Sequence, residues 1–269
     1  MARSVAWKPR GVVGVASVRR QSPVERFLPE TLLEPLVEHF WSISWELEGQ
    51  PPQTGETLPH PSVYLVVEAG RSGLAGVNTR RFQRLLEDRG RVYGVKFRPG
   101  GFRPFWTAPV KSLTDQVLPL EAAFSAAGGA MEAAVLRCGG DVPAAVSILE
   151  AFLLARLPPP DPKAQLARAL VARILEDRTL TQAEAVARVA GLSLRTLQRL
   201  FNDYVGVSPK WVIQRYRLHD AMEALEGPQP VDLPALALSL GFYDQAHFIR
   251  VFKAFLGRTP TGYLRGREG

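Results

Sequence analysis

Polar and apolar residues alternate along parts of the first half of the chain. Residues 41–47 read Trp-Ser-Ile-Ser-Trp-Glu-Leu, the two-residue period of a strand that buries one face. Residues 62–68, Ser-Val-Tyr-Leu-Val-Val-Glu, predict a second, more deeply buried strand. Residues 82–86 and 91–97 flank an Asp-Arg-Gly turn at 88–90, so we expect them to form a β-hairpin.

The pattern then becomes helical. Residues 120–137 and 142–157 are rich in Ala and Leu, which favour helices. Residues 157–163 read Leu-Pro-Pro-Pro-Asp-Pro-Lys, and a run of prolines cannot continue a helix and favours an extended spacer. The sequence therefore predicts an α+β domain at 1–156, in which a small sheet is followed by helices, and a proline-rich linker at 157–163.

After the linker, residues 164–269 are expected to form an all-α domain in which one design occurs twice. A short helix stops at Gly191 and a longer one follows, and another short helix stops at Gly241 before a second longer one. The order of short helix, glycine, capping residue and longer helix is that of a helix-turn-helix unit. A long helix over residues 209–225 joins the two predicted units.

Capping residues mark where these helices begin. Ser193, Ser208 and Asp244 each stand directly before a helical pattern, where a side-chain oxygen can accept a hydrogen bond from the first turn. Thr181 stands three residues before Glu184, the spacing of a capping box. We therefore expect Thr181 to open the first short helix.

Composition changes this picture little. Residues 163–269 hold 15 of the 33 basic and 10 of the 26 acidic side chains, a modest excess that suits a partner rich in phosphate. The single cysteine, Cys138, excludes a disulfide within the chain, and the four histidines have no metal-ligand spacing. No nucleophile or phosphate-loop motif occurs, so we expect no catalytic residue, metal or other cofactor. No apolar run is long enough to span a bilayer, and we expect a cytoplasmic protein without membrane contact.

Residues 236–263 carry a distinctive series of side chains. The series comprises Gly241, Phe242, Phe248, Arg250, Phe252, Lys253, Gly257, Thr259, Pro260 and Tyr263. It resembles the signature of the AraC/XylS family of transcription regulators, and residues 197–201 and 206–209 are similar to the upstream half of that family's domain. The resemblance covers about residues 163–265. It implies binding to double-stranded promoter or operator DNA, with RNA polymerase as a further partner.

The N-terminal half is similar to a sensor-like domain that precedes such units. The resemblance is carried by His-Phe-Trp-Ser at 39–42 and by residues 94–101 and 113–120, and it names no ligand. The side chains that we consider for a small-molecule effector are Trp41, Trp45, Tyr64, Phe97, Arg98 and Trp106. The same rings could instead form only the core of the domain.

In a helix-turn-helix unit the second helix enters the major groove and presents exposed side chains to base edges. On the first such helix these are expected to be Arg195, Thr196, Gln198, Arg199 and Asn202. On the second they are Gln245, Ala246, His247 and Arg250, with Lys253 expected on a phosphate. Arginine can pair with guanine and Gln or Asn with adenine, whereas His247 suits a base or a phosphate equally.

Two alternatives remain open for the N-terminal domain. It could serve dimerisation or another protein interaction without any small ligand. A regulator that responds to alkylation or oxidation through Cys138 is the other alternative, although the Leu-Arg-Cys-Gly-Gly context lacks the Pro-Cys-His-Arg pattern of known methyl acceptors.

Overall fold

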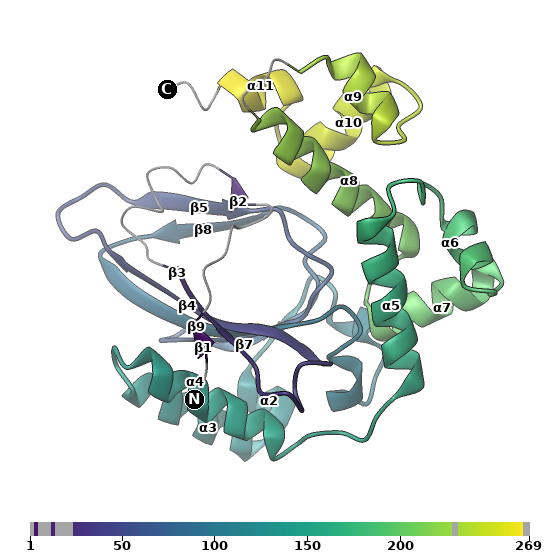
Figure 1. The fold of residues 1–269 in the computed structure, drawn as a ribbon. Coiled ribbons are helices and arrows are strands. Elements are labelled where there is room, and N and C mark those ends of the chain that lie inside the picture. The colour runs from purple at the N-terminus through teal and green to yellow at the C-terminus, as the bar shows by residue number, and fades with distance from the viewer. Residues whose placement is uncertain (1–2, 5–11, 14–23, 228–230, 266–269) are drawn as a thin grey trace.

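The computed structural model describes residues 3–4, 12–13, 24–227 and 231–265, with a β-rich N-terminal part and a helical C-terminal part (Figure 1). The larger sheet has the strand order β1-β3-β4-β9-β6-β7-β10. Its strands are β1 Arg3–Ser4, β3 Val24–Leu28, β4 Val37–Glu46, β6 Tyr64–Glu68, β7 Gly73–Ala75, β9 Arg89–Phe97 and β10 Val117–Leu118. The smaller sheet consists of β2 Val12–Val13, β5 Gln53–Thr57 and β8 Phe82–Leu86. The predicted α+β class is confirmed.

The predicted hairpin between β8 and β9 is wrong. The two strands do meet at a tight turn, where Asp88 has a φ of 51°. However, β8 pairs with β5, whereas β9 pairs with β4 and β6. The chain therefore crosses from the smaller sheet to the larger one at this turn, and a turn signal in the sequence cannot distinguish such a crossing from a hairpin.

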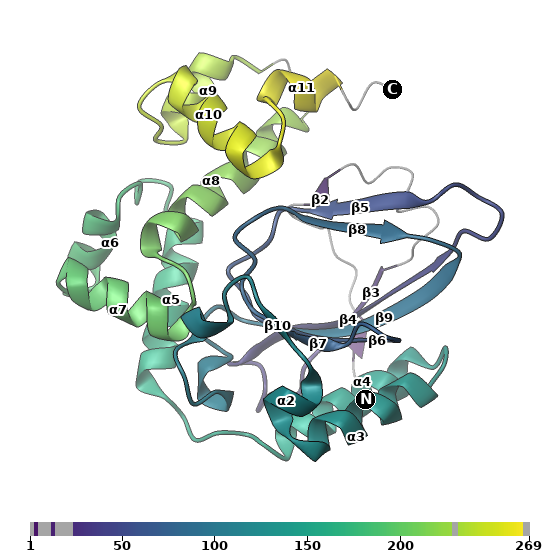
Figure 2. The ribbon, with the colours of Figure 1, turned by 180° about the vertical axis from the view of Figure 1, so that it is seen from behind.

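The larger sheet has two differently covered faces. Helices α2–α4 pack on one face, and the smaller sheet lies over the other (Figures 1 and 2). The helices are α2 Leu120–Phe124, α3 Ala126–Arg137 and α4 Val142–Leu154. A helix was expected over 120–137 without a break, but Ser125 adopts a φ of 56° and divides it in two.

The side chains of β4 divide between these faces as the alternation predicts. Phe40 lies fully buried in the cluster that α3 and α4 cover. Trp41, Ile43 and Trp45 point to the opposite face and pack with Leu86 of β8. We call this opposite surface, between the two sheets, the inner face.

The C-terminal part is helical in all its described elements. The helices are α5 Pro162–Glu176, α6 Ala183–Val189, α7 Leu194–Tyr204, α8 Pro209–Leu225, α9 Leu233–Ser239, α10 Gln245–Leu256 and α11 Pro260–Arg265. Ser193, Ser208 and Asp244 each accept a hydrogen bond from the backbone three residues on, which confirms the predicted caps. The predicted capping box is wrong, because α6 begins after Gln182 without any side-chain cap.

Candidate DNA interface

Helices α6 and α7 form the first helix-turn-helix unit, and α9 and α10 form the second. In each unit a glycine in the left-handed region ends the short helix, Gly191 with φ 63° and Gly241 with φ 76°. The next residue then donates its backbone N–H to the short helix, from Leu192 to Ala187 at 2.9 Å and from Phe242 to Ala237 at 3.0 Å. The internal repeat in the sequence thus corresponds to two turns with the same hydrogen bond.

Helix α7 presents a polar face opposite a buried one. Leu197, Leu200 and Phe201 are buried in the core of the first unit. The five residues expected to meet DNA lie on the remaining surface. Arg195, Gln198 and Arg199 are exposed, and Thr196 and Asn202 are half-buried. Thr196 also belongs to the cap, because its backbone N–H donates to Ser193 Oγ at 3.1 Å.

Helix α10 has the same division. Phe248, Phe252 and Leu256 are buried in the core of the second unit. Of the residues expected to meet DNA, Ala246, Arg250 and Lys253 are exposed, and Gln245 and His247 are half-buried. The ring of His247 lies edge-on to Phe242, with centroids 5.5 Å apart, which limits the directions that its nitrogens can reach.

One exposed residue beside α10 was not anticipated. The turn between α9 and α10 is one residue longer than the turn between α6 and α7, and the extra residue is Tyr243. Its side chain is 87% exposed. The sequence does carry the signal, because the repeat spacing changes from 50 between the two glycines to 51 between the two caps, Ser193 and Asp244.

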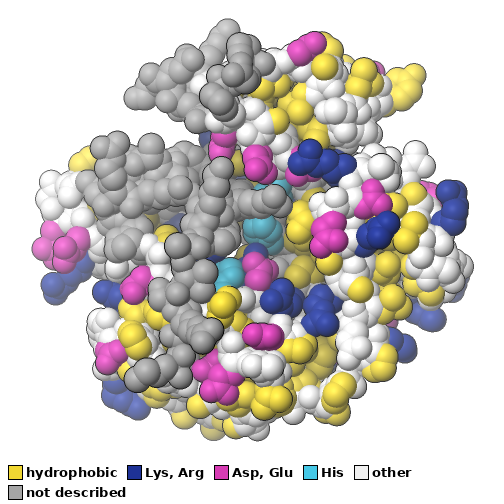
Figure 3. All heavy atoms as spheres, viewed as in Figure 1, with side chains coloured by type: hydrophobic (Ala, Val, Ile, Leu, Met, Phe, Trp, Pro, Cys, Tyr) yellow, Lys and Arg dark blue, Asp and Glu magenta, His cyan; other side chains and the backbone are white. Residues whose placement is uncertain are grey.

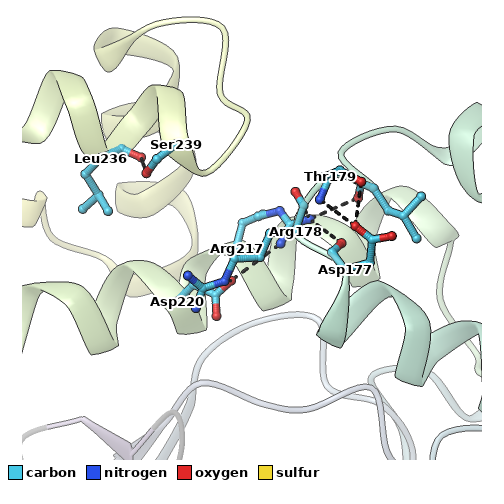
Figure 4. A network of polar contacts seen from close by, with 8 residues as sticks. Asp177, Arg178, Thr179, Arg217, Asp220, Leu236 and Ser239 are labelled. Carbon is cyan, nitrogen blue, oxygen red and sulfur yellow. Dashed lines mark hydrogen bonds and ion pairs between the residues drawn. The ribbon is translucent and has the colours of Figure 1, made fainter.

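Helix α8 joins the two units and is buried along most of its length. Arg217 on this helix reaches the turn between α5 and α6 (Figure 4), where its Nη2 donates to the backbone carbonyl of Arg178 at 2.9 Å and that of Leu180 at 3.2 Å. Burial lowers the pKa of Arg217, and Asp220, 3.6 Å away, opposes that effect. These buried charges hold the first unit against α8.

Charge alone does not mark the interface. On the face shown in Figure 3, the Lys and Arg side chains that can be seen over the C-terminal helices are interspersed with Asp and Glu. The structure therefore agrees with the modest charge excess in the sequence: the repeated fold and the exposed faces of α7 and α10 are the informative features.

Comparisons with known proteins support the interpretation that the C-terminal helices form helix-turn-helix units. Residues 186–266 match a family model described as a helix-turn-helix domain. The transcriptional regulator GlxA of Rhizobium meliloti is 39% identical over 85 residues, which are 32% of this chain and 26% of that protein. The transcriptional activator RhaS of Escherichia coli O139:H28 is 34% identical over 86 residues, 32% of this chain and 31% of that protein. The C-terminal domain is an AraC-type helix-turn-helix domain.

The similarity outside the AraC-type domain says less. The chain spans between a quarter and a third of the length of GlxA and RhaS, at 26% and 31%. Residues 25–119 match a family model described only as a domain of unknown function, DUF6597. The structure of ToxT from Vibrio cholerae O395 covers 86% of this chain and 98% of its own, but at 12% identity and a TM-score of 0.41, which is too low to carry over any property.

The six side chains considered for an effector do not form one site. Phe97 is buried in the core under α3 and α4, and Trp106 packs on that core beside Phe102. Arg98 lies where the N-terminal domain meets α5, and its Nε donates to the carbonyl of Glu34 at 2.6 Å. An open pocket of about 320 Å³ is found there, lined by Glu34, Pro35, Arg98 and Arg168.

Trp41, Trp45 and Tyr64 do share the inner face. Trp41 lies over Gly94 and Trp45 over Gly90 in the neighbouring strand β9, in direct register. The indole of Trp45 donates to the carbonyl of Glu87 at 3.0 Å. The indole N–H of Trp41 is buried and has no hydrogen-bond partner among the described residues.

An ion pair between a buried lysine and a half-buried glutamate, neither of them among the sequence-based candidates, lies at the same end of the inner face. Lys96 Nζ is 2.8 Å from Glu38 Oε1, and Tyr64 and His39 flank Lys96 in register. Burial alone would raise the pKa of Glu38, but a hydrogen bond with His39 and the Lys96 ammonium outweigh it and bring the pKa to about 2. Burial lowers the pKa of Lys96 and of His39.

The tryptophan–glycine pairs give a prediction for the inner face. A Cβ on Gly94 would overlap the ring of Trp41, so Gly94→Ala is expected to displace that ring and to cost about 1–3 kcal/mol of stability, with a change in tryptophan fluorescence. Gly55→Ala on β5 is the matched control, since its Cβ would have no neighbour closer than 3.8 Å. Equal stability and unchanged fluorescence in the two variants would contradict the close packing.

The remaining candidate features stay unassigned. Cys138 is half-buried, with Sγ 3.5 Å from the carbonyl oxygen of Ala134. Within the described residues, no group of three or more metal-ligating side chains is found, and no helix is both long and apolar enough to cross a membrane.

Proposed function

We propose that the chain is a sequence-specific transcription regulator that binds a bipartite DNA site through α7 and α10. One observation carries the proposal: two equivalent helices, joined through the continuous helix α8, each expose arginine and amide or small side chains opposite a buried apolar stripe. Because one chain carries both helices, it can occupy two successive stretches of the major groove without forming a dimer. RNA polymerase is proposed as a further partner.

Base contacts are proposed for Arg195, Gln198, Arg199 and Asn202 on α7 and for Gln245, Ala246, His247 and Arg250 on α10. Thr196 stands at the start of α7, where it also serves the cap. Lys253 is exposed in the last turns of α10 and is proposed to bind a phosphate. Arg258 is less available than Lys253 for a phosphate contact, because its guanidinium lies 5.0 Å from the ring centroid of Tyr263.

Exchange of single side chains tests this assignment. Arg199→Ala and Arg250→Ala are each expected to cost about 1–3 kcal/mol in binding to the preferred DNA and to relax the preference at one position. Lys253→Ala should weaken binding to all sequences about equally and reduce its salt dependence. The measurement is selection from a random DNA pool by the full chain, followed by titration of the selected site. Arg173→Ala, an exposed arginine on α5, is the control.

The selection itself decides the proposed function. If the wild-type chain enriches no sequence from the pool, it is not a sequence-specific regulator. If it does enrich a site but Arg199→Ala binds that site unchanged, the proposed orientation of α7 is wrong while the function stands.

For the N-terminal domain we propose a response to a small molecule that binds at the inner face. The support is the buried indole N–H of Trp41 and the charged Lys96–Glu38 pair, which a purely structural core would have little reason to contain. Melting of the chain in the presence of a panel of metabolites tests the proposal, with sedimentation alongside it. Ligand-dependent melting supports sensing, whereas a mass that rises with protein concentration and no ligand effect supports dimerisation instead.

A further inference from the structure

Among the described residues, the N-terminal domain contributes one buried apolar side chain to the core of each helix-turn-helix unit. Val77 lies fully buried in the cluster of the first unit, and Leu58 is 1% exposed in the cluster of the second. Beside them, Thr114 donates its hydroxyl to the carbonyl of Gly206 at 2.6 Å, and His60 stacks on His219 of α8 with centroids 4.6 Å apart. The N-terminal domain thus contacts both units.

Arg215 of α8 lies where these contacts converge. Its side chain has no solvent exposure, and its guanidinium lies between two aromatic rings, 4.5 Å from that of Trp211 and 4.6 Å from that of Phe255. Trp211 packs on the core of the first unit and Phe255 on the core of the second. Nη2 donates to the carbonyl of Thr79 in the N-terminal domain at 3.1 Å. The side chain of Arg215 therefore contacts the N-terminal domain and both helix-turn-helix units.

The buried position of Arg215 costs free energy of folding. Its Nε and Nη1 are buried and have no hydrogen-bond partner within the described part of the chain. Burial lowers its pKa to about 9, so the guanidinium is still charged at neutral pH. A buried cation with unpaired donors loses free energy that water would restore. Withdrawal of the loop that carries Thr79 would admit that water. The unpaired donors of Arg215 therefore favour release of the loop, whereas its apolar contacts favour docking.

The loop that supplies the carbonyl is shaped by a single carboxylate. Asp115 accepts the backbone N–H of Thr79 at 2.7 Å and its hydroxyl at 2.6 Å. Asp115 itself has a φ of 59°, and its own N–H donates to the carbonyl of Val77 at 3.0 Å. The carboxylate thereby fixes both the carbonyl that Arg215 binds and the segment that carries Val77.

We propose that Arg215 is a positioning residue through which docking of loop 76–80 of the N-terminal domain sets the relative placement of α7 and α10. The inference rests on the proposed bipartite DNA binding. A docked loop holds the guanidinium between Trp211 and Phe255 and so holds the second unit against the first. Release of the loop leaves the two helix-turn-helix units freer to move relative to each other. The preorganised spacing between α7 and α10 is then lost.

Four variants of the full chain test the proposal. Asp115→Gly removes the carboxylate and tolerates the left-handed backbone, whereas Asp115→Asn keeps an acceptor and serves as its control. Arg215→Lys keeps the charge and loses the planar stacking. The fourth variant combines Asp115→Gly with Arg215→Lys. Binding is titrated on the selected site and on versions in which one base pair is inserted or deleted between its two segments.

Asp115→Gly and Arg215→Lys are each expected to weaken binding to the natural spacing roughly fivefold or more. Both single variants should lose less affinity than wild type does when the spacing of the site is altered. The double variant should bind DNA no more weakly than the more weakly binding single variant. Asp115→Asn should resemble wild type. If Asp115→Gly fails to fold by circular dichroism, Thr79→Val, which loses only the hydroxyl contact, takes its place.

Additive losses in the double variant, or an unchanged spacing preference in folded single variants, would overturn the proposal. That result differs from failure of the proposed function, because in this case the wild-type chain still selects a specific site. A wild type that selects no site overturns the proposed function instead, and the positioning role of Arg215 with it.

Discussion

Replacing Arg217 by Met is expected to lower the free energy of unfolding by about 3 kcal/mol. The side chain is 2% exposed and donates to backbone carbonyls in the turn between α5 and α6 (Figure 4). Methionine fills a similar volume but donates nothing, so both carbonyls lose this donor, and that of Leu180 loses it in a buried position. It also removes the cation 3.6 Å from Asp220, whose side chain is 7% exposed.

Arg173→Met is the matched control for this prediction. Arg173 forms an ion pair with Asp177 at the same turn, 3.3 Å long, but its side chain is 56% exposed. Exposed pairs of this spacing are worth about 0.3–0.5 kcal/mol. Urea denaturation of both variants measures the difference. Comparable small losses would mean that the turn is held by the apolar core of the first unit and that Arg217 adds little.

The helix-turn-helix units could be predicted because their signals are local. A capping side chain, a glycine and an apolar stripe each act within a few residues, and α7 and α10 begin where Ser193 and Asp244 predict. A local error in these units concerns Thr181, where the spacing of a capping box occurs without the contact. The chain enters α6 one residue later than the motif requires.

The features that the sequence did not reveal depend on contacts between distant segments. Nothing near Asp88 says that β8 and β9 enter different sheets, because their partners β4, β5 and β6 lie up to about 50 residues away. The buried charges of α8 are a similar case. Arg215 and Arg217 lie at positions that a solvent-exposed helix would also fill with arginine, and their burial follows only from loop 76–80 and the turn after α5.

The candidate ligand residues show the same limit. Trp41 and Trp45 share a face because the two-residue period of a strand requires it. Phe97 is directed into the opposite core, and Arg98 lies at the surface next to α5. No sequence pattern marks Lys96 as a ligand residue, since only the register between β4, β6 and β9 brings it beside Glu38 and Tyr64.

The Lys96–Glu38 pair carries the second large expected effect. Glu38→Gln should lower the free energy of unfolding at neutral pH by about 3 kcal/mol, because Lys96 is 6% exposed and would lose the carboxylate 2.8 Å from its ammonium. Glu48→Gln is the control, since Glu48 and Arg89 form a pair whose side chains are 67% and 76% exposed. That change should have little effect.

The pH dependence of stability separates the pair from simple loss of packing. The pKa of Glu38 falls from an ordinary value of 4.5 to about 2 on folding, so its contribution is present above pH 4.5 and is lost as the pH falls towards 2. Glu38→Gln should lack this acid-sensitive part. Its stability should instead rise as the pH is raised towards 10, because a stranded Lys96 binds its proton more weakly in the folded chain than in the unfolded one.

A second substitution shows which lost interaction lowers the free energy of unfolding in Glu38→Gln. If the penalty in Glu38→Gln is the unpaired ammonium, then adding Lys96→Met should recover most of the lost stability, since a buried pair can often be replaced by apolar side chains at little cost. If instead Glu38 stabilises the fold through its hydrogen bond with His39, the double variant should remain as unstable as the single one. Recovery of stability together with loss of any ligand-dependent melting would then show that the charges of the inner face are kept for binding and not for folding.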